Sequence, residues 1–131
     1  MAHPDLTQRI AEIKTRIQQV SPDDVVNIIE NLDRKIVILD VREDSEYETG
    51  HLATAINLPY IEIEEKINHI ITDKSATIVS YCQSGNRSAL ATDTLNKLGY
   101  ENAVSLAGGI TAWKTEGKAV INKDFSPNTS H

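Results

Sequence analysis

Residues 77–87 read TIVSYCQSGNR, and this stretch indicates the fold class. Its first five residues form a continuous run rich in β-branched side chains, which is typical of a short strand buried on both faces of a sheet. Gly85 and Asn86 tolerate the left-handed backbone of a tight turn. A helix is predicted after the turn, as far as Leu98. The stretch therefore predicts a strand, a loop and a helix, with Cys82 where the strand meets the loop.

The same alternation continues on either side of this unit. Strands are predicted over residues 36–39, 55–58 and 103–106. Helices are predicted over residues 22–31, over residues 60–71, and after Gly108 and Gly109, where Gly117 ends the last one. Strands that alternate with helices favour an α/β fold with parallel strands and helices on both faces of the sheet.

The first twenty residues have a helical pattern of their own. Apolar side chains recur at spacings of four, three, four and three residues, at Leu6, Ile10, Ile13, Ile17 and Val20. We therefore expect an amphipathic helical extension over residues 1–20, a domain over 21–121 and a polar tail over 122–131. The extension could dock on the domain, or it could be a short seam for a partner or a second copy.

Length and charge narrow the possible functions. The chain has 131 residues, which is enough for one domain, and a net charge of −6, which argues against nucleic acid or an anionic membrane as a partner. No apolar run approaches the ~18–20 residues that span a bilayer, and the N-terminus does not resemble a signal peptide. The histidines lack metal-ligand spacing and no phosphate or dinucleotide loop is present, so we expect no metal and no cofactor.

The chain contains one cysteine, so no disulfide can form within it and no cysteine-based zinc cluster is possible. This usage indicates a reducing compartment, most simply the cytoplasm. Cys82 could be an inert core residue, as free cysteines often are. However, loop amides and Arg87 could stabilise its thiolate, and the carboxyl ends of parallel strands are where ligands bind. We therefore take Cys82 as a candidate nucleophile.

Four blocks of sequence together resemble the rhodanese-like family. Residues 82–88 (CQSGNRS) match its C-x-x-G-x-R-S loop, and residues 40–42 (DVR) match its Asp-Val-Arg strand end. Residues 46–59, which contain GHLA and AINLP, and residues 106–113 (LAGGITAW) are similar to two further family signatures. The blocks occur in order between Val20 and Val120, and each alone is weaker evidence than all four.

This resemblance implies a five-stranded parallel sheet between helices, and sulfurtransferase chemistry. A cysteine would take a sulfane sulfur from thiosulfate or a persulfide donor and pass it to cyanide or another thiol. Cys82 would then be the nucleophile and carrier. The cradle for the bound sulfur would be the loop Gln83, Ser84, Gly85, Asn86 and Arg87.

Two features of this sequence refine the expectation. Without a second cysteine, the sulfur must leave to an external acceptor, such as a small thiol or a protein, in a ping-pong cycle. Gln83 and Ser84 carry no charge, whereas family members with good thiosulfate turnover often have Arg or Lys there. We therefore expect weak thiosulfate binding and a small-molecule or protein persulfide as the better donor. We also expect a monomer.

The roles of the charged neighbours stay open. Asp40 and Arg42 could position the loop or a substrate, or they could form a structural ion pair, perhaps with Glu46. Arg87 could bind an anion or close the loop at the helix start. His51 is more simply structural than a general base.

Other functions also remain open. Cysteine phosphatases have a C-x5-R loop, whereas this chain has C-x4-R, a tighter ring suited to a single sulfur. An arsenate reductase would need an external thiol relay. A rhodanese-like module could instead dock on or deliver sulfur to a partner, with little turnover of small molecules.

Overall fold

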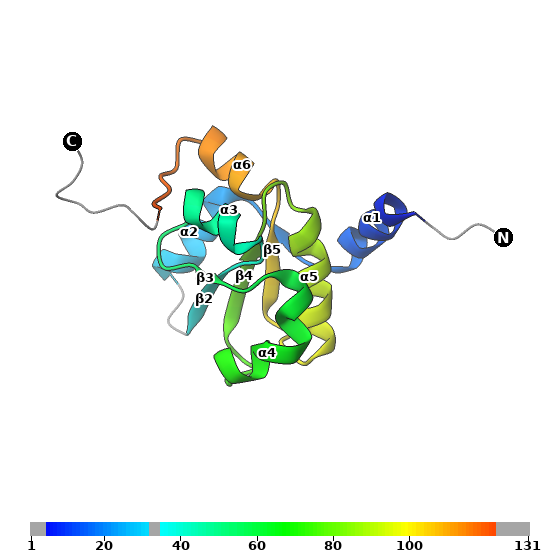
Figure 1. The fold of residues 1–131 in the computed structure, drawn as a ribbon. Helices are drawn as coiled ribbons and strands as arrows, with labels where there is room; N and C mark the ends of the chain where they lie inside the picture. The colour runs from blue at the N-terminus through cyan, green and yellow to red at the C-terminus, as the bar shows by residue number, and fades with distance from the viewer. Residues whose placement is uncertain (1–4, 32–34, 123–131) are drawn as a thin grey trace.

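The computed structural model describes residues 5–31 and 35–122, and these residues form an α/β fold around one sheet (Figure 1). Five parallel strands make the sheet, in the spatial order β1-β5-β4-β2-β3. The strands are β1 (Gln19–Val20), β2 (Ile36–Asp40), β3 (Ile56–Asn57), β4 (Thr77–Tyr81) and β5 (Ala103–Leu106). The helices are α1 (Leu6–Arg16), α2 (Pro22–Asn31), α3 (Asp44–Thr49), η1 (Tyr60–Glu62), α4 (Ile63–Ile70), α5 (Asn86–Lys97) and α6 (Gly109–Thr115). The fold class predicted from the sequence is confirmed.

Side chains alternate between the two faces of the sheet, so each strand contributes to two cores. Val37, Leu39 and Ile78 pack with α4 and α5 on one face. Ile38 and Val79 pack on the other face, where α2 and α6 lie. Because both faces are covered, the central strands are buried along nearly their whole length, which explains why their sequences are rich in apolar residues.

Most of the predicted boundaries hold, with differences at the ends. Helix α2 has the expected bounds, and Ser21 and Asp24 cap it by exchanging side-chain hydrogen bonds with each other's backbone N–H groups. The strand predicted over 55–58 is reduced to Ile56–Asn57. The helix predicted over 60–71 is a 3-10 turn followed by α4. The last helix runs to Thr115 with Glu116 as its C-cap, so Gly117 ends it as predicted. Helix α3 has no apolar stripe and was not predicted.

The N-terminal segment is not one helix as far as Val20. Helix α1 ends at Arg16, and Gln19–Val20 forms an edge strand whose residues pair with Ser105 and Leu106 of β5. The helical prediction is wrong from Ile17 onward. Val20 fits the apolar spacing of the helix, but it is buried as part of the edge strand instead. The polar tail predicted over 122–131 lies outside the described residues except for its first residue.

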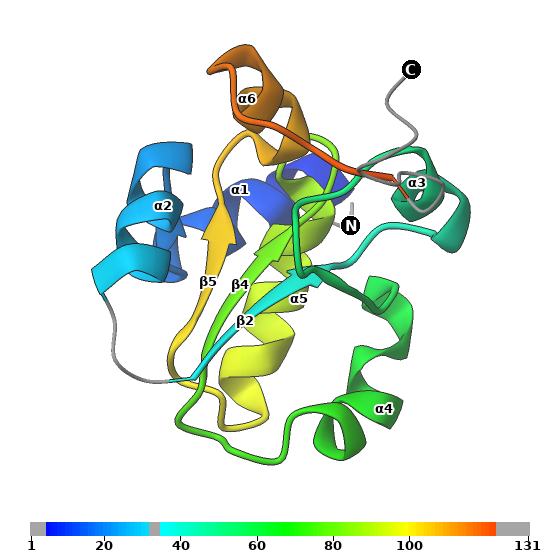
Figure 2. The same ribbon diagram turned by 90° about the vertical axis from the view of Figure 1, so that its left-hand side faces the viewer.

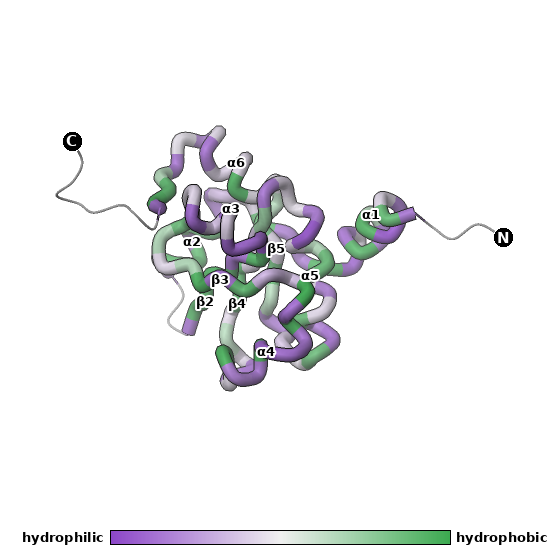
Figure 3. Tube along the Cα trace, viewed as in Figure 1, coloured by the Kyte–Doolittle hydropathy of each residue, from purple (hydrophilic) through white to green (hydrophobic). Residues whose placement is uncertain are grey.

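Helix α1 docks on α5 through most of its apolar stripe, although Leu6 at its start is 57% exposed. Ile10, Ile13 and Ile17 are buried against Ala89, while hydrophilic residues alternate with them along the helix (Figure 3). Burial of each isoleucine contributes about 1.5–3 kcal/mol, which is enough to hold a helix of this length in place. Within the described ranges, no helix is both long enough and apolar enough to cross a membrane.

Candidate functional site

The candidate site lies at the carboxyl edge of the sheet. The arrows of β5, β4 and β2 run side by side in one direction, and α6 lies beyond their tips (Figure 2). The segments that follow these three strands begin at Val41, Cys82 and Ala107, so all three lie at this edge of the sheet. In parallel sheets this edge is where ligands bind.

Cys82 immediately follows β4, and its sulfur is surrounded by donors from the following turn. The backbone N–H of Gly85 donates to Sγ at 3.1 Å, and that of Ser88 donates at 3.3 Å. The Cys82 thiol donates to Ser88 Oγ at 3.6 Å. With 1% of its surface exposed, Cys82 sits on the α4–α5 side of the sheet, at the base of the loop. Two amides directed at one sulfur can stabilise negative charge on it.

Ser88 is the last residue of the CQSGNRS motif, and the motif alone assigns it no role. Its hydroxyl lies 2.8 Å from Ser105 Oγ, so a short chain of buried hydroxyls leads from β5 to the sulfur. Once the thiol is deprotonated, Ser88 Oγ can turn its hydrogen toward Sγ while Ser105 donates to it. A serine three residues after a turn glycine is the signal that could have indicated this position.

Helix α6 supports the loop from behind. Ile110 N–H donates to Cys82 O at 2.9 Å, and Thr111 N–H donates to Gln83 O at 3.1 Å. Gly109 has a positive φ of 60°, and a Cβ there would lie 2.5 Å from both of these carbonyl oxygens. Only glycine therefore allows α6 to approach so closely, and its amides bind the loop carbonyls while the loop amides face the sulfur.

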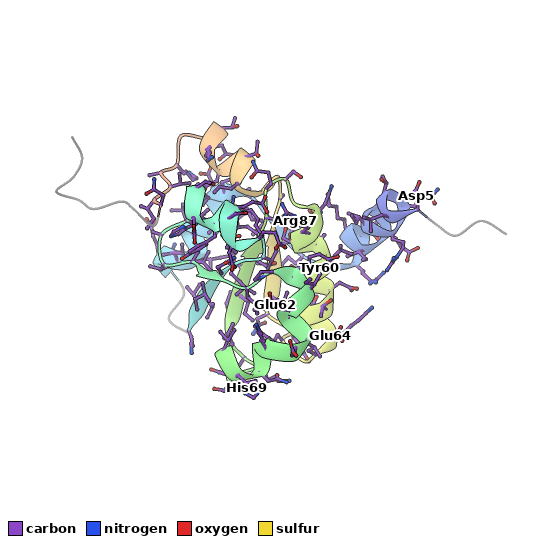
Figure 4. The ribbon with its side chains drawn as sticks, in the orientation of Figure 1. Asp5, Tyr60, Glu62, Glu64, His69 and Arg87 are labelled. Carbon is purple, nitrogen blue, oxygen red and sulfur yellow. The ribbon has the colours of Figure 1, made fainter. Side chains whose placement is uncertain are left out.

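Arg87 closes the loop through an ion pair with α3, near the N-terminal end of α5 (Figure 4). Its Nη1 and Nη2 donate to Glu46 Oε1 and Oε2 at 2.7 and 3.0 Å. This bidentate hydrogen bonding lowers the pKa of Glu46 to about 2, and it raises the pKa of Arg87. Glu46 was suggested as a partner for Asp40 and Arg42, and pairing with Arg87 was not foreseen.

Asp40 and Arg42 form a buried ion pair with each other. Arg42 Nη2 donates to Asp40 Oδ2 at 2.7 Å and to the carbonyl of Gly50 at 2.6 Å. The hydroxyl of Tyr81 also donates to Asp40 Oδ2, at 2.7 Å, and accepts from Leu52 N–H. Burial, reinforced by the charge of Asp40, raises the pKa of Tyr81, which keeps the phenol protonated as a donor. Asp40 is fully buried and Arg42 is only 3% exposed, which favours the structural interpretation of both residues.

The remaining candidate residues divide between the loop rim and the core. Gln83, Ser84 and Asn86 are exposed at the rim. His51 is buried, stacks on Tyr47 at 3.7 Å between ring centroids, and shares a hydrogen bond with its carbonyl. Across residues 5–31 and 35–122, no group of three or more His, Cys, Asp or Glu side chains is arranged to hold a metal ion.

Comparison with known proteins supports the resemblance found in the sequence. The rhodanese-like domain model matches residues 21–116. An uncharacterized protein of Bacillus subtilis, YqhL, is 40% identical over 86 residues, covering 66% of this chain and 67% of its own. Thiosulfate:glutathione sulfurtransferase of Saccharomyces cerevisiae is 31% identical over 114 residues, covering 79% and 82% of the two chains.

A solved structure agrees with these relatives. The crystal structure of a rhodanese-related protein from Thermoplasma volcanium superposes with a TM-score of 0.69 at 35% identity, covering 79% of this chain and 97% of its own. The family match takes in most of the chain, the strands are all parallel, and the cysteine loop stands at their carboxyl edge. The chain therefore belongs to the rhodanese-like domain family.

Proposed function

We propose that this protein is a sulfurtransferase that carries a sulfane sulfur as a persulfide on Cys82. The observation that carries the proposal is the pair of amides, from Gly85 and Ser88, directed at Sγ at 3.1 and 3.3 Å. The name of the yeast relative, a thiosulfate:glutathione sulfurtransferase, supports the same chemistry.

The proposed first step begins with the Cys82 thiolate attacking the terminal sulfur of the donor. A new bond forms between Sγ and that sulfur. The bond to the rest of the donor breaks, and its electron pair leaves with sulfite from thiosulfate, or with a thiolate from a persulfide. The terminal sulfur of the resulting Cys82 persulfide carries the negative charge, and the loop from Gln83 to Arg87 would cradle it.

In the second step an acceptor thiolate or cyanide attacks the terminal sulfur. The products are a new persulfide or thiocyanate, together with the original Cys82 thiolate. Neither step requires an oxidant or a reductant, because the transferred sulfur atom keeps its oxidation state and the electron pair of the broken bond leaves with the departing group. Since the chain has no second cysteine, the bound sulfur has no internal thiol to react with, and a ping-pong cycle follows.

We further propose that a persulfide is a better donor than thiosulfate. Gln83 and Ser84 are neutral, and both guanidinium nitrogens of Arg87 that face Glu46 are engaged by its carboxylate. The loop therefore offers little uncompensated positive charge to a dianion. Replacement Gln83→Lys should lower the Michaelis constant for thiosulfate by about fivefold, as one partly exposed ion pair would. An unchanged constant, or a constant already low in the wild type, would contradict this part.

The engaged Arg87 also bears on the rival enzyme classes. A phosphatase or arsenate reductase needs an arginine free to bind an oxyanion, whereas here the guanidinium forms a bidentate pair with Glu46. Independently, the C-x4-R loop is one residue shorter than the phosphatase loop and forms a tighter ring suited to a single sulfur atom. Delivery of sulfur to a protein acceptor remains compatible with the proposed chemistry. We also propose that the protein is a monomer and works in the cytoplasm.

The test is intact-mass spectrometry of the reduced protein after incubation with thiosulfate and, separately, with a small persulfide. The expected result is one added sulfur atom that disappears when cyanide is added and never forms on Cys82→Ser. If neither donor gives an adduct, the carrier proposal is wrong, and arsenate reduction would be tested next.

A further inference from the structure

Helix α1 contacts the cysteine loop directly. Lys14 Nζ donates to Asn86 Oδ1 at 2.9 Å, across 72 residues of sequence. Asn86 is the first residue of α5 and follows Gly85, whose amide donates to the sulfur. The buried stripe of α1 and a bidentate ion pair between Arg16 and Asp93 hold the helix against α5. Lys14 is thus positioned at the loop by a rigid support rather than by a flexible arm.

Lys14 differs from the nearby cations Arg16 and Arg87, whose charges carboxylates neutralise. Arg16 pairs with Glu12 and Asp93, and Arg87 pairs with Glu46. In the part of the chain that the structure describes, no carboxylate forms an ion pair with Lys14, whose bonded partner is a neutral amide oxygen. On a chain with a net charge of −6, Lys14 therefore supplies attraction for an anion at the edge of the cysteine loop.

A groove of about 280 Å³ lies beside this lysine, between α1 and the start of α5. Its lining is mostly apolar and consists of Leu6, Thr7, Ile10, Ala11, Lys14 and Asn86. The volume exceeds what an inorganic dianion requires and is near the lower end for sites that hold organic ligands. A mostly apolar lining with one cation suits an organic anion better than thiosulfate, which has no apolar part.

We propose that this groove binds the carboxylate-bearing part of a small, peptide-sized thiol that exchanges sulfur with Cys82. The bound group is the same whether the thiol arrives as a persulfide donor or as an acceptor. Lys14 would pair with a carboxylate, Asn86 would hydrogen-bond to the peptide portion, and the apolar lining would cover its aliphatic carbons. The groove's role in sulfur exchange rests on the proposed function, whereas its ability to bind such a ligand can be measured separately.

Binding is tested with S-methylglutathione, which has the carboxylates and the peptide but can neither give nor accept sulfur. Titration into isotope-labelled full-length protein should shift the amide resonances of α1 and of the start of α5. Lys14→Gln should weaken binding by about threefold to fivefold, as expected for one partly exposed ion pair. Arg9→Gln is the matched control, because it removes the same charge from an exposed position of α1 outside the groove lining. It should leave binding unchanged.

A kinetic measurement separates the possible donors. The rate of sulfur uptake at Cys82 is measured with glutathione persulfide, thiosulfate and an uncharged alkyl persulfide. Each donor is tested on the wild type, Lys14→Gln and Arg9→Gln. Lys14→Gln should slow uptake from glutathione persulfide by the same factor and leave the uncharged donor unaffected. An equal effect on all donors, or equal effects of Lys14→Gln and Arg9→Gln, would overturn the groove assignment.

The two proposals fail in different ways. Absence of any shift from S-methylglutathione, with normal sulfur uptake, would refute the groove and leave the sulfurtransferase proposal standing. Binding in the groove without sulfur uptake from any donor would refute the sulfurtransferase proposal and support the groove as a binding site.

Discussion

Replacing Gly109 by alanine tests the support that α6 gives to the cysteine loop. Gly109 and Gly117 both have positive φ angles, 60° and 80°, so an alanine at either position adopts a left-handed backbone. That conformation costs roughly 1–2 kcal/mol for an L-residue. The two sites differ in the space around them. A Cβ at Gly109 would lie 2.5 Å from the carbonyl oxygens of Cys82 and Gln83, whereas a Cβ at Gly117 would have no atom of the described residues within 4 Å. Gly117→Ala is therefore the matched control.

The steric conflict at Gly109 can be relieved when α6 or the loop backbone moves by nearly an ångström. Such a shift weakens the hydrogen bonds from Ile110 N–H and Thr111 N–H to the loop, each worth about 0.5–1.5 kcal/mol. We expect Gly117→Ala to lower the free energy of unfolding by about 1 kcal/mol and Gly109→Ala by about 2–4 kcal/mol. A typical domain has 5–15 kcal/mol of stability, so both variants should remain folded.

Urea denaturation measures the stability of both variants, and intact mass measures sulfur uptake under conditions where both are folded. Gly109→Ala should take up sulfur more slowly, because the amides of Gly85 and Ser88 move with the loop, whereas Gly117→Ala should match the wild type. If the two variants lose equal stability and retain equal uptake, α6 does not fix the loop and the reasoning is wrong.

Three further predictions concern single side chains of the site. Ser88→Ala should slow sulfur uptake by about tenfold, because it removes the hydroxyl that can donate to Sγ but keeps the backbone N–H; unchanged kinetics in a mass time course would contradict this. Glu46→Gln should cost less than about 1 kcal/mol at pH 7, since its pair with Arg87 is partly exposed. The pKa of Glu46 is lowered from 4.5 to about 2, so the pair stabilises the fold fully above about pH 4.5 and this stability is lost as pH falls toward 2. Urea midpoints of Glu46→Gln and the wild type should converge over that interval, and a constant difference would refute the assignment. Arg42→Met should cost about 3–5 kcal/mol in urea denaturation because it leaves the Asp40 carboxylate buried without its cation; a loss below 1 kcal/mol would be inconsistent with a buried pair.

The elements that the sequence predicted well are those with strong local signals. Strands β2, β4 and β5 are rich in apolar and β-branched residues because helices cover both faces of the sheet, and α2 has a capping box at Ser21. Local sequence therefore specified most of the central sheet. The resemblance to rhodanese-like proteins added the fifth strand, but it did not place that strand in the chain.

The elements that were missed depend on contacts between distant parts of the chain. Strand β1 has two residues, and only pairing with β5 distinguishes it from a continuation of the preceding helix. Helix α3 has six residues and no apolar stripe, and it is stabilised by a capping box between Glu43 and Glu46. Short segments of this kind carry too few residues for a periodic pattern to develop.

The same limit applies to the candidate site. Cys82 and its loop were identified from sequence, because a cysteine, a glycine and an arginine occur at spacings that fit one turn. The partner of Arg87 could not be chosen, since Glu46 is 41 residues away and is surrounded by other carboxylates. The contact between Lys14 and Asn86 spans a still longer separation, and nothing in either local sequence indicates it.

The central claim is that sulfur resides covalently on Cys82 between its two transfers. The most direct test is to load the protein with sulfur, remove all donor by gel filtration, and then add an acceptor thiol. The account predicts that each loaded chain transfers one sulfur atom to the acceptor and returns to its original mass, with no donor present. A loaded chain that keeps its sulfur until donor is added again would contradict the account, because donor and acceptor would then have to bind together.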